Sequence, residues 1–275
     1  MTTAKFGLIG GGVMGEALLS RLLEQKIYQP SEILVSDPQQ QRRDFLAREY
    51  GVEVTTDNRL VVTSTTEVLL LAVKPQIFDT IASELADWQV GGETITGALV
   101  ISIMAGVPLQ RLEAAFPSRP MVRVMPNAPA TVGAGMSAIA PGKHIQPEHQ
   151  ELATRILQSV GQVVEVPETL MDAVTGLSGS GPGYVAILIE SLTDGGVRAG
   201  LPRAIAYQLA LQTVLGTAVM LQKSGMHPAQ LKDRVTSPGG TTIAGIAELE
   251  SLGFRSALIE AVVAAKERSQ ELGNS

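Results

Sequence analysis

The sequence contains no cysteine, which excludes disulfide bonds, thiolate metal sites and cysteine nucleophiles together. Its three histidines, His144, His149 and His227, are scattered, and none has a metal-ligating neighbour at helical spacing. We therefore expect no metal site. Basic residues do not cluster beyond the pair Arg42 and Arg43, and the net charge is -6. Because a nucleic acid or an anionic membrane would need a basic surface, neither is an expected partner.

Long hydrophobic runs and targeting signals are missing as well. The first residues lead straight into a strand-like segment, without the pattern of a signal peptide. The uninterrupted apolar runs, such as residues 68–73, are far shorter than a membrane span. Hydrophobic residues nevertheless make up 45% of the 275 residues and charged residues 17%, which is typical of globular proteins. These features predict a cytoplasmic protein of one large domain or two modest ones.

The first half of the sequence alternates short apolar runs with amphipathic stretches, for example at residues 15–25 and 40–50. The runs that we expect to be strands are residues 5–9, 32–36, 68–73, 99–103 and 121–125, with shorter runs at 137–140 and 163–166. Apolar strands separated by helices are typical of a parallel sheet that is covered on both faces. The pattern predicts an α/β fold, with a Rossmann-like, doubly wound dinucleotide-binding domain in residues 1–168.

After residue 168 the strand-like runs disappear. Ala, Leu and Ile recur at helical spacing through residues 184–197, 202–222 and 254–271, and the middle stretch is rich in small residues, which let helices approach closely. We expect residues 169–275 to form an all-α domain. Because a helical domain of this size does not readily complete its own core, we also expect it to pack against a second copy of itself.

The run Gly10-Gly11-Gly12-Val13-Met14-Gly15 has the spacing G-x-G-x-x-G and lies between an expected strand and an expected helix. In this context Gly10 permits a tight turn, Gly12 lets the backbone approach a pyrophosphate, and Gly15 lets the helix pack close to the strand. Free amides at the helix N-terminus would then face the phosphates. Glycine-rich turns also serve structural ends, but this placement between strand and helix favours dinucleotide binding.

The next strand leaves the choice of cofactor open. It ends in Ser36-Asp37, and a carboxylate at that position can accept hydrogen bonds from both hydroxyls of the adenosine ribose and repel a 2′-phosphate. That favours NAD. Arg42 and Arg43 lie just downstream, however, and a guanidinium can bind a 2′-phosphate. The two arginines could equally well be solvated residues in the first turn of a helix. NADH and NADPH therefore both remain candidates, with a slight preference for NAD.

Two later turns, Val73-Lys74-Pro75 and Met104-Ala105-Gly106, also end expected strands. Ligands of doubly wound sheets bind beyond the carboxyl ends of the strands, so we expect both turns to line the cofactor rather than to be ordinary loops. The expected cofactor-binding residues are Ile9, Gly10, Gly11, Gly12, Val13, Met14, Gly15, Ser36, Asp37, Asn58, Val73, Lys74, Pro75, Met104, Ala105 and Gly106.

The second half carries motifs of higher specificity. They are Thr175-Gly-Leu-Ser-Gly-Ser-Gly-Pro-Gly-Tyr184, Asp194-Gly-Gly196 and Ser237-Pro-Gly-Gly-Thr-Thr242, the last within a longer run from Pro228 to Glu250. Matching motifs in the first half are Ala72-Val-Lys-Pro75, Ala105-Gly106 and Met125-Pro-Asn-Ala-Pro129. On these motifs the chain resembles the pyrroline-5-carboxylate reductases over essentially its whole length.

The resemblance implies an NAD(P)H-dependent oxidoreductase that reduces 1-pyrroline-5-carboxylate to L-proline, the last step of proline biosynthesis, by hydride transfer to the ring imine. It also implies a homodimer with interleaved C-terminal helices, often assembled into a ring of five dimers. It places Thr242 against the ring nitrogen as the catalytic residue. Glu168 and Arg234 are secondary site candidates by the same resemblance, although a surface ion pair is the alternative for both.

Residues 237–242 also suggest how a substrate carboxylate could be bound. Glycines directly before an expected helix at residues 243–252 allow consecutive backbone amides to converge on an anion, although such a turn is often only an N-cap. Because Thr242 is not a strong acid, we expect it to orient the substrate and donate a hydrogen bond. The expected substrate-binding residues are Glu168, Ser237, Gly239, Gly240, Thr241 and Thr242.

The chain departs from the family pattern at Asp37, where many members carry a small hydroxyl residue and usually prefer NADPH. The alternative enzyme is a related Rossmann imine reductase or β-hydroxyacid reductase. The hydroxyacid families usually carry a lysine on the long helix after the nucleotide domain, and residues 184–196 contain none. The alternative from another class is a non-catalytic dinucleotide-binding module, which would bind the cofactor without depending on Thr242.

Overall fold

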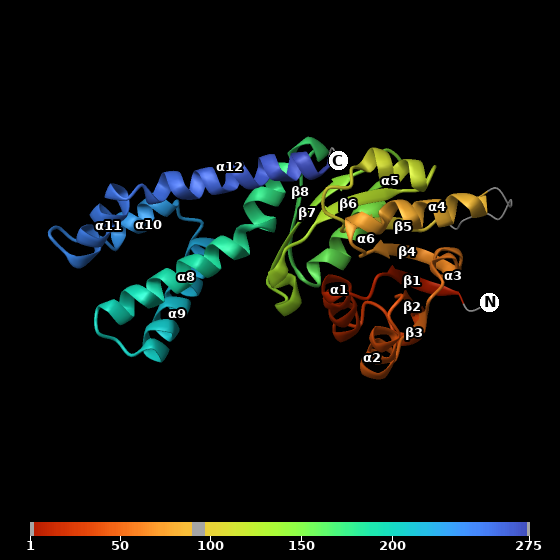
Figure 1. Ribbon diagram of the computed structural model, residues 1–275, viewed down its shortest axis with the longest axis horizontal. Helices are drawn as coiled ribbons and strands as arrows, with labels where there is room; N and C mark the ends of the chain where they lie inside the picture. The colour runs from red at the N-terminus through yellow and green to blue at the C-terminus, as the bar shows by residue number, and fades with distance from the viewer. Residues whose placement is uncertain (1–2, 90–96, 274–275) are drawn as a thin grey trace. The chain divides into compact units, whose positions relative to one another are not determined.

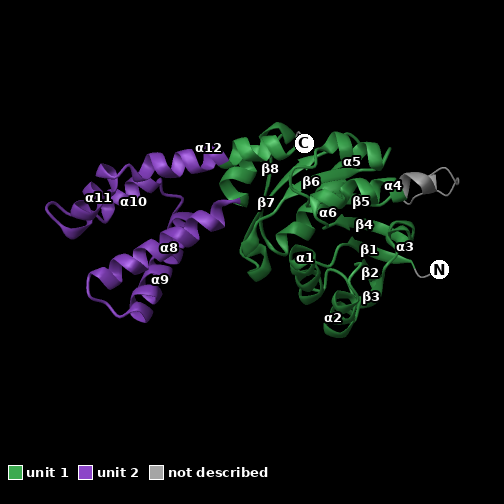
Figure 2. Cartoon of the chain, viewed as in Figure 1, with its two compact units in different colours: residues 1–179, 265–275 green, residues 180–264 purple. Residues whose placement is uncertain are grey.

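The computed structural model describes residues 3–89 and 97–273. The chain divides into two compact units, one of residues 1–179 with 265–275 and one of residues 180–264 (Figure 2). This division differs from a boundary after residue 168, because Met171 packs into the core of the first unit and the neighbouring Asp172 binds Ser269 there. The predicted boundary at residue 168 separates a dinucleotide-binding domain from a dimerisation domain. The division into compact units does not test it, so it stays a prediction.

The first unit is built on one sheet with the strand order β3-β2-β1-β4-β5-β6-β7-β8 (Figure 1). Its strands are β1 (Ala4–Ile9), β2 (Ile33–Ser36), β3 (Glu53–Thr55), β4 (Thr65–Leu71), β5 (Leu99–Ser102), β6 (Met121–Met125), β7 (Gly135–Pro141) and β8 (Gly161–Glu165). Strands β1 to β6 are all parallel, β7 is antiparallel to β6, and β8 is parallel to β7. The winding direction reverses between β1 and β4, which is where doubly wound sheets bind their ligands.

Helices cover both faces of this sheet. They are α1 (Val13–Glu24), α2 (Gln40–Tyr50), α3 (Asn58–Ser64), α4 (Phe78–Gln89), α5 (Leu109–Ala115), α6 (Pro147–Gln158) and α7 (Met171–Val174). Successive residues of a strand point to opposite faces, so Val68 and Leu70 of β4 join a hydrophobic cluster with α1, α2 and α6. Leu69 and Leu71 join the other cluster, with α3, α4 and α5. The predicted doubly wound α/β fold is confirmed.

The predicted strands agree with the observed ones to within a few residues, except that β3 was not predicted. It has only three residues, lies at the edge of the sheet and exposes Glu53. A strand this short has no hydrophobic alternation long enough to stand out in the sequence. The reversal of β7 relative to β6 was not predicted either.

The second unit is entirely helical, as predicted. Its helices are α8 (Gly181–Arg198), α9 (Arg203–Ser224), α10 (Pro228–Arg234), α11 (Thr241–Ser251) and most of α12 (Phe254–Gly273), whose residues from Ala265 belong to the first unit. Helices α8 and α9 approach closely at Gly196, where a Cβ would lie 2.9 Å from the Cβ of Ala206. Within residues 180–264, all of which the structure describes, the buried residues are Thr193, Ala206, Ala210 and Leu231.

Among residues 3–89 and 97–273, one helix, α9, is long and apolar enough to cross a membrane by length and composition alone. Polar residues such as Gln208 and Gln212 interrupt its sequence, which is why no long apolar run is visible there. Core helices of proteins outside membranes pass the same test. Little of this helix is buried within the single chain, so its apolar surface is available to another molecule.

Candidate active site

Glycines shape the turn between β1 and α1. Gly10 has φ +98°, and a Cβ there would lie 2.7 Å from the carbonyl oxygen of Ala72. A Cβ on Gly15 would lie 2.3 Å from the carbonyl oxygen of Gly10, so only glycine lets α1 pack this close to the turn. Around Gly12 the corresponding position has no atom within 4 Å. The backbone before α1 is therefore open to an approaching pyrophosphate.

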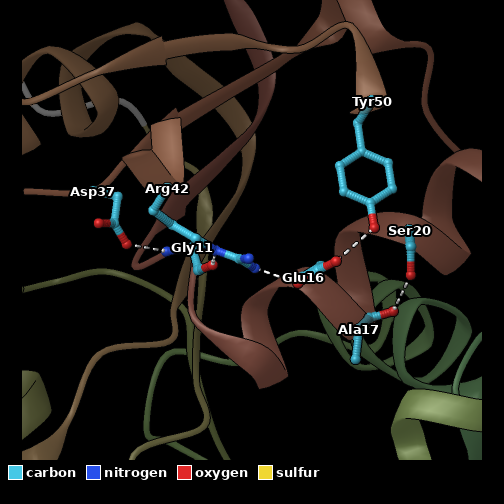
Figure 3. Close-up of polar contacts among 7 residues, drawn as sticks. All are labelled: Gly11, Glu16, Ala17, Ser20, Asp37, Arg42 and Tyr50. Atoms are coloured by element: carbon cyan, nitrogen blue, oxygen red, sulfur yellow. Dashed lines mark hydrogen bonds and ion pairs between the residues drawn. The ribbon is translucent and has the colours of Figure 1, made fainter. Parts of the chain in front are cut away.

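Asp37, directly after β2, faces this turn and is only 9% exposed (Figure 3). Its Oδ2 accepts a hydrogen bond from the backbone N–H of Gly11 at 3.0 Å, and its Oδ1 accepts one from the N–H of Gln39 at 2.9 Å. Asp37 therefore holds the glycine turn against the end of β2. A carboxylate oxygen can accept more than one hydrogen bond, so the predicted contact with a ribose stays a prediction beside this structural role.

Arg42 completes the support of the turn from the other side. Its Nε donates to the carbonyl oxygen of Gly11 and its guanidinium also pairs with Glu16 of α1, which accepts a further hydrogen bond from the hydroxyl of Tyr50 at 2.8 Å (Figure 3). Partial burial raises the pKa of Glu16, but the hydrogen bonds from Arg42 and Tyr50 outweigh it and hold this pKa below its ordinary value. Burial, followed by the contact with Glu16, raises the pKa of Tyr50 to about 12.

Arg43 binds backbone rather than another side chain. Its Nη1 donates to the carbonyl oxygens of Asp37 at 2.8 Å and of Pro38 at 2.9 Å. Arg42 is thus bound to the glycine turn and α1, and Arg43 to the backbone directly after β2. Neither is merely a solvated helical residue. Whether either also meets a 2′-phosphate stays a prediction.

A cavity of about 570 Å³ opens at the carboxyl ends of β1, β2 and β4, a size typical of small-molecule sites. Ser36 and Asn58 form a polar part of its wall: the Ser36 hydroxyl donates to Oδ1 of Asn58 at 2.7 Å, and Nδ2 of Asn58 donates to Glu84 at 3.1 Å. The lining residues are Ile9, Gly10, Ser36, Pro38, Thr56, Asp57, Asn58, Arg59, Val73, Ile77, Thr80, Ile81 and Glu84. Five of the predicted cofactor residues, Ile9, Gly10, Ser36, Asn58 and Val73, therefore meet in one cavity.

The other predicted cofactor residues do not line this cavity. Lys74 and Pro75 begin the helical turn after β4, and Ala105 and Gly106 follow β5. The side chain of Met104 is buried in the hydrophobic cluster on the α3, α4 and α5 face.

The predicted substrate loop, residues 237–242, lies in the second unit between α10 and α11. The N–H of Gly240 donates to the carbonyl oxygen of Ser237 at 3.1 Å, which closes a tight turn. Gly239 has φ +68°, and a Cβ on Gly240 would lie 2.4 Å from Oγ of Ser237. The shape of the turn therefore requires glycine at 239, whereas at Gly240 the closest atom belongs to the Ser237 side chain, which can rotate away.

Gly240 is the N-cap of α11 and no side chain caps this helix. The first amides of α11, from Thr241 and Thr242, therefore lack a capping partner, and such amides attract anions. Thr242 is half-buried, whereas Ser237 and Thr241 are exposed. The cofactor residues and this loop belong to different compact units, so each group of residues is brought together separately.

Comparison with known proteins accounts for both halves of the chain. Residues 168–272 match the family model for pyrroline-5-carboxylate reductase dimerisation, and residues 5–106 match a model described as NADP oxidoreductase, coenzyme F420-dependent. The sequence is 60% identical to the pyrroline-5-carboxylate reductase of Synechocystis over 98% of both chains. The chain belongs to the pyrroline-5-carboxylate reductase family.

Solved structures of pyrroline-5-carboxylate reductases share the fold over the whole chain. The structure from Coxiella burnetii has a TM-score of 0.89 at 35% identity and covers 98% of both chains. The structure from Plasmodium falciparum, with NADP bound, has a TM-score of 0.85 at 31% identity and covers 99% of both chains. Members of this family are oxidoreductases that reduce pyrroline-5-carboxylate to proline with NAD(P)H.

Glu168 is engaged within the first unit. Its Oε1 accepts hydrogen bonds from Nη1 of Arg123 at 2.9 Å and from the backbone N–H of Leu109 at 2.6 Å. Arg123 is buried, and Leu109 is the first residue of α5. Glu168 thus balances a buried cation and caps a helix. A contact between Glu168 and the substrate stays a prediction, as does one from Arg234, which is exposed at the end of α10.

Sequence reasoning missed several residues that shape the reductase's site. The N-cap of α3 is Asp57, whose Oδ1 accepts from the N–H of Arg59 at 2.8 Å and so positions Asn58 in the cavity. An aspartate directly before an amphipathic stretch is a recognisable N-cap signal. No local signal points to Arg123 or to Glu16, because their partners are distant in the sequence. Within the described ranges 3–89 and 97–273, no group of three or more His, Cys, Asp or Glu side chains could hold a metal ion.

Proposed function

We propose that the protein catalyses the reduction of 1-pyrroline-5-carboxylate to L-proline, with a hydride from NAD(P)H, as the last step of proline biosynthesis. The observation that carries this proposal is the 60% identity to a pyrroline-5-carboxylate reductase over 98% of both chains. The glycine turn and the adjoining cavity of the first unit supply the geometry that a dinucleotide requires.

The cofactor fits the residues present at the ends of β1, β2 and β4. The open backbone at Gly12 and the amides of Val13 and Met14 suit the pyrophosphate, and the cavity beside Ser36 and Asn58 suits the adenosine. The turns at residues 73–75 and 104–106 would hold the remaining half. When bound, the reduced cofactor supplies the hydride.

The substrate loop supports the second half of the proposal. The uncapped amides of Thr241 and Thr242 are suited to bind the substrate carboxylate, and Ser237, Gly239 and Gly240 shape the turn that presents them. Thr242 would direct its hydroxyl to the ring nitrogen. As the hydride adds to the imine carbon, the electron pair of the C=N double bond moves to nitrogen, and the protonated imine becomes the amine. Placing the reacting carbons within ~3.5 Å of each other would supply most of the acceleration.

The exposed apolar helices of the second unit support a homodimer. Residues 168–272 match a dimerisation region, and α9 leaves Leu209 and Leu215 exposed in the single chain. A partner copy would cover α9, which removes the need for a membrane. We further propose a cytoplasmic location, assembly of dimers into a decamer, and no nucleic-acid partner, the last in line with the net charge of -6.

The test is oxidation of NADH and of NADPH, in parallel, in the presence of racemic 1-pyrroline-5-carboxylate. We expect turnover, and the ratio of the two rates measures the cofactor preference. Folded protein that binds the cofactor but shows no turnover with either one would contradict the proposal. A panel of β-hydroxyacids, assayed by reduction of NAD+ and NADP+, tests the alternative enzyme, and no turnover is expected with it.

A further inference from the structure

The C-terminal end of α12 lies in the first unit beside the turn that follows β5. A Cβ built on Gly273 would lie 3.5 Å from the carbonyl oxygen of Gly106, and one built on Gly106 would lie 3.9 Å from the backbone of Gly273. Gly106 has φ +75°, which suits glycine and few other residues. A methyl group on either glycine would therefore be in van der Waals contact with the other backbone, so the last turn of α12 lies directly beside the segment Met104-Ala105-Gly106.

The segment of residues 104–106 lies on the side of the sheet where the reactive end of a bound cofactor would be. The adenosine cavity lies at the ends of β1, β2 and β4, on the side of β3. A dinucleotide that crosses the glycine turn after β1 continues in the opposite direction, toward β4 and β5. Residues 104–106 directly follow β5, so they lie where the nicotinamide must be oriented.

One part-buried hydrogen bond holds the end of α12 in place. Ser269 is 7% exposed, and its hydroxyl donates to Oδ1 of Asp172 at 2.7 Å. Asp172 belongs to α7, only four residues beyond Glu168, which binds the N–H of Leu109 at 2.6 Å. The segment 168–172 thus holds both flanks of the turn, with Glu168 fixing its downstream end and Asp172 fixing the helix packed against it.

Met104 and Val107 anchor the turn in the hydrophobic core, but its side toward α12 is incompletely packed. A cavity of about 460 Å³ is lined by Gly106, Pro108, Arg123, Asp172, Gln270 and Gly273. Where packing is incomplete, the position of a backbone segment depends on a few specific contacts. The hydrogen bond between Ser269 and Asp172 is such a contact.

We propose that Ser269 and Asp172 are positioning residues for hydride transfer, which act by holding the end of α12 against residues 104–106. This inference rests on the proposed reductase function. The two side chains do not touch the substrate. They set the orientation of the nicotinamide through the turn, so their loss affects the chemical step more than the binding of the adenosine half.

The first variant is Ser269→Ala. We expect kcat to fall about tenfold, because small displacements of reacting groups cost up to about a hundredfold in rate. The KM for the cofactor and the affinity for the adenosine fragments 5′-ADP and 2′,5′-ADP should stay unchanged, since the adenosine cavity lies elsewhere. Ser251→Ala is the matched control: it removes an exposed hydroxyl that donates to Glu248 on α11, and it should keep the wild-type kcat.

A charge variant makes the test sharper. Ser269→Asp sets a second carboxylate against Asp172, and the repulsion should lower kcat further than Ser269→Ala does. Adding Asp172→Asn to that variant removes the like charge and should restore part of the activity. Asp172→Asn alone retains an oxygen that accepts from Ser269 and should keep most of the wild-type kcat. The rescue shows that the effect acts through the contact between positions 269 and 172. A fall in kcat with unchanged fragment binding distinguishes positioning from a general loss of structure.

Hydrogen exchange of residues 104–109 in cofactor-free protein tests the support directly. Faster exchange in Ser269→Ala and Ser269→Asp, with unchanged fragment binding, is expected. Unchanged kcat and unchanged exchange in both variants would overturn the inference, and so would a fall in kcat matched by an equal loss of fragment binding. If the wild type shows no reductase activity, the proposed function fails, while the exchange measurement still decides the role of Ser269 and Asp172.

Discussion

The two compact units bury their apolar residues to very different extents. The sheet unit has a hydrophobic cluster on each face, and residues such as Leu70 are completely buried. In the helical unit, the buried residues include the small Ala206 and Ala210, while Leu209 and Leu215 of α9 are each 54% exposed. The sheet unit completes its own core, whereas the helical unit leaves its longest helix uncovered.

This difference indicates that the two units have different functions. The cofactor residues are positioned by hydrogen bonds within one chain, such as those of Asp37 and Arg42 to Gly11. The loop that we propose binds the substrate, with Thr242, lies in the helical unit, which matches a dimerisation region. We therefore expect cofactor binding to depend on the sheet unit alone and turnover to depend on association as well.

The largest effect on association should come from Leu215→Glu on α9. A charge buried in an apolar interface without a partner is strongly unfavourable, so we expect association to weaken by at least ~2 kcal/mol, or roughly 30-fold. Sedimentation velocity over a range of protein concentrations measures this change. Lys223→Glu is the control, because it places the same charge at an exposed polar position of α9. An unchanged sedimentation profile for Leu215→Glu would break the comparison.

A truncation in the sheet unit should instead act independently of association. Leu70→Ala removes a completely buried side chain from β4, and such changes lower the free energy of unfolding by about 2–5 kcal/mol. Urea unfolding followed by circular dichroism measures the loss. The loss should be the same at low and high protein concentration. A loss that grows on dilution would show that this core also depends on a partner.

Local sequence patterns predicted much of this division. The apolar runs located seven strands of the sheet, and the spacing of Gly10, Gly12 and Gly15 located the turn. Gly10 and Gly15 have a steric reason for glycine, and Gly12 leaves open space for a ligand. The helical periodicity after residue 168 predicted the second unit. These features depend on neighbours in the sequence, which is why sequence alone suffices for them.

The contacts that hold the site could not be predicted in this way. Asp37 was expected to face a ribose, and its hydrogen bond to Gly11 joins residues 26 positions apart. Glu168 was expected at the substrate, and its bond to Arg123 spans 45 positions. A carboxylate carries no local signal of which distant donor it meets. Strand β3, whose three residues pair with β2, can likewise be recognised only once the fold is known.

Substitution of Asp37 tests whether the sheet unit positions the cofactor through its own hydrogen bonds. Asp37→Ala leaves the N–H of Gly11 without its acceptor, and we expect both NAD and NADP to bind about tenfold more weakly, a loss of ~1–2 kcal/mol. Titrations of each cofactor by calorimetry measure the two affinities. If the variant binds NAD more weakly but NADP more tightly, the main role of Asp37 is to contact the adenosine ribose.

The smallest effect concerns acid stability of the sheet unit. The pKa of Glu16 in the folded protein lies below its ordinary value of 4.5, so its ionised form stabilises the fold above that pH. This contribution disappears as the pH falls through the folded pKa. We expect Glu16→Gln to cost less than about 1 kcal/mol at neutral pH, because the pair with Arg42 is partly exposed.

Urea unfolding of wild type and Glu16→Gln at a series of pH values measures this difference. It should shrink as the pH falls below about 4.5. Tyr50→Phe, which removes one of the two donors to Glu16, should show a smaller pH-dependent difference. A gap between wild type and Glu16→Gln that is constant with pH would mean that ionised Glu16 does not stabilise the unit.

The division of labour itself is tested most directly by Thr242→Ala, with turnover, cofactor affinity and sedimentation measured on the same preparation. The account predicts that kcat falls by at least about a hundredfold, because a hydrogen bond to the reacting nitrogen is lost. Cofactor affinity and association should both stay at wild-type values. Full turnover in Thr242→Ala, or a loss of cofactor affinity equal to the loss of rate, would contradict the assignment of chemistry to the helical unit.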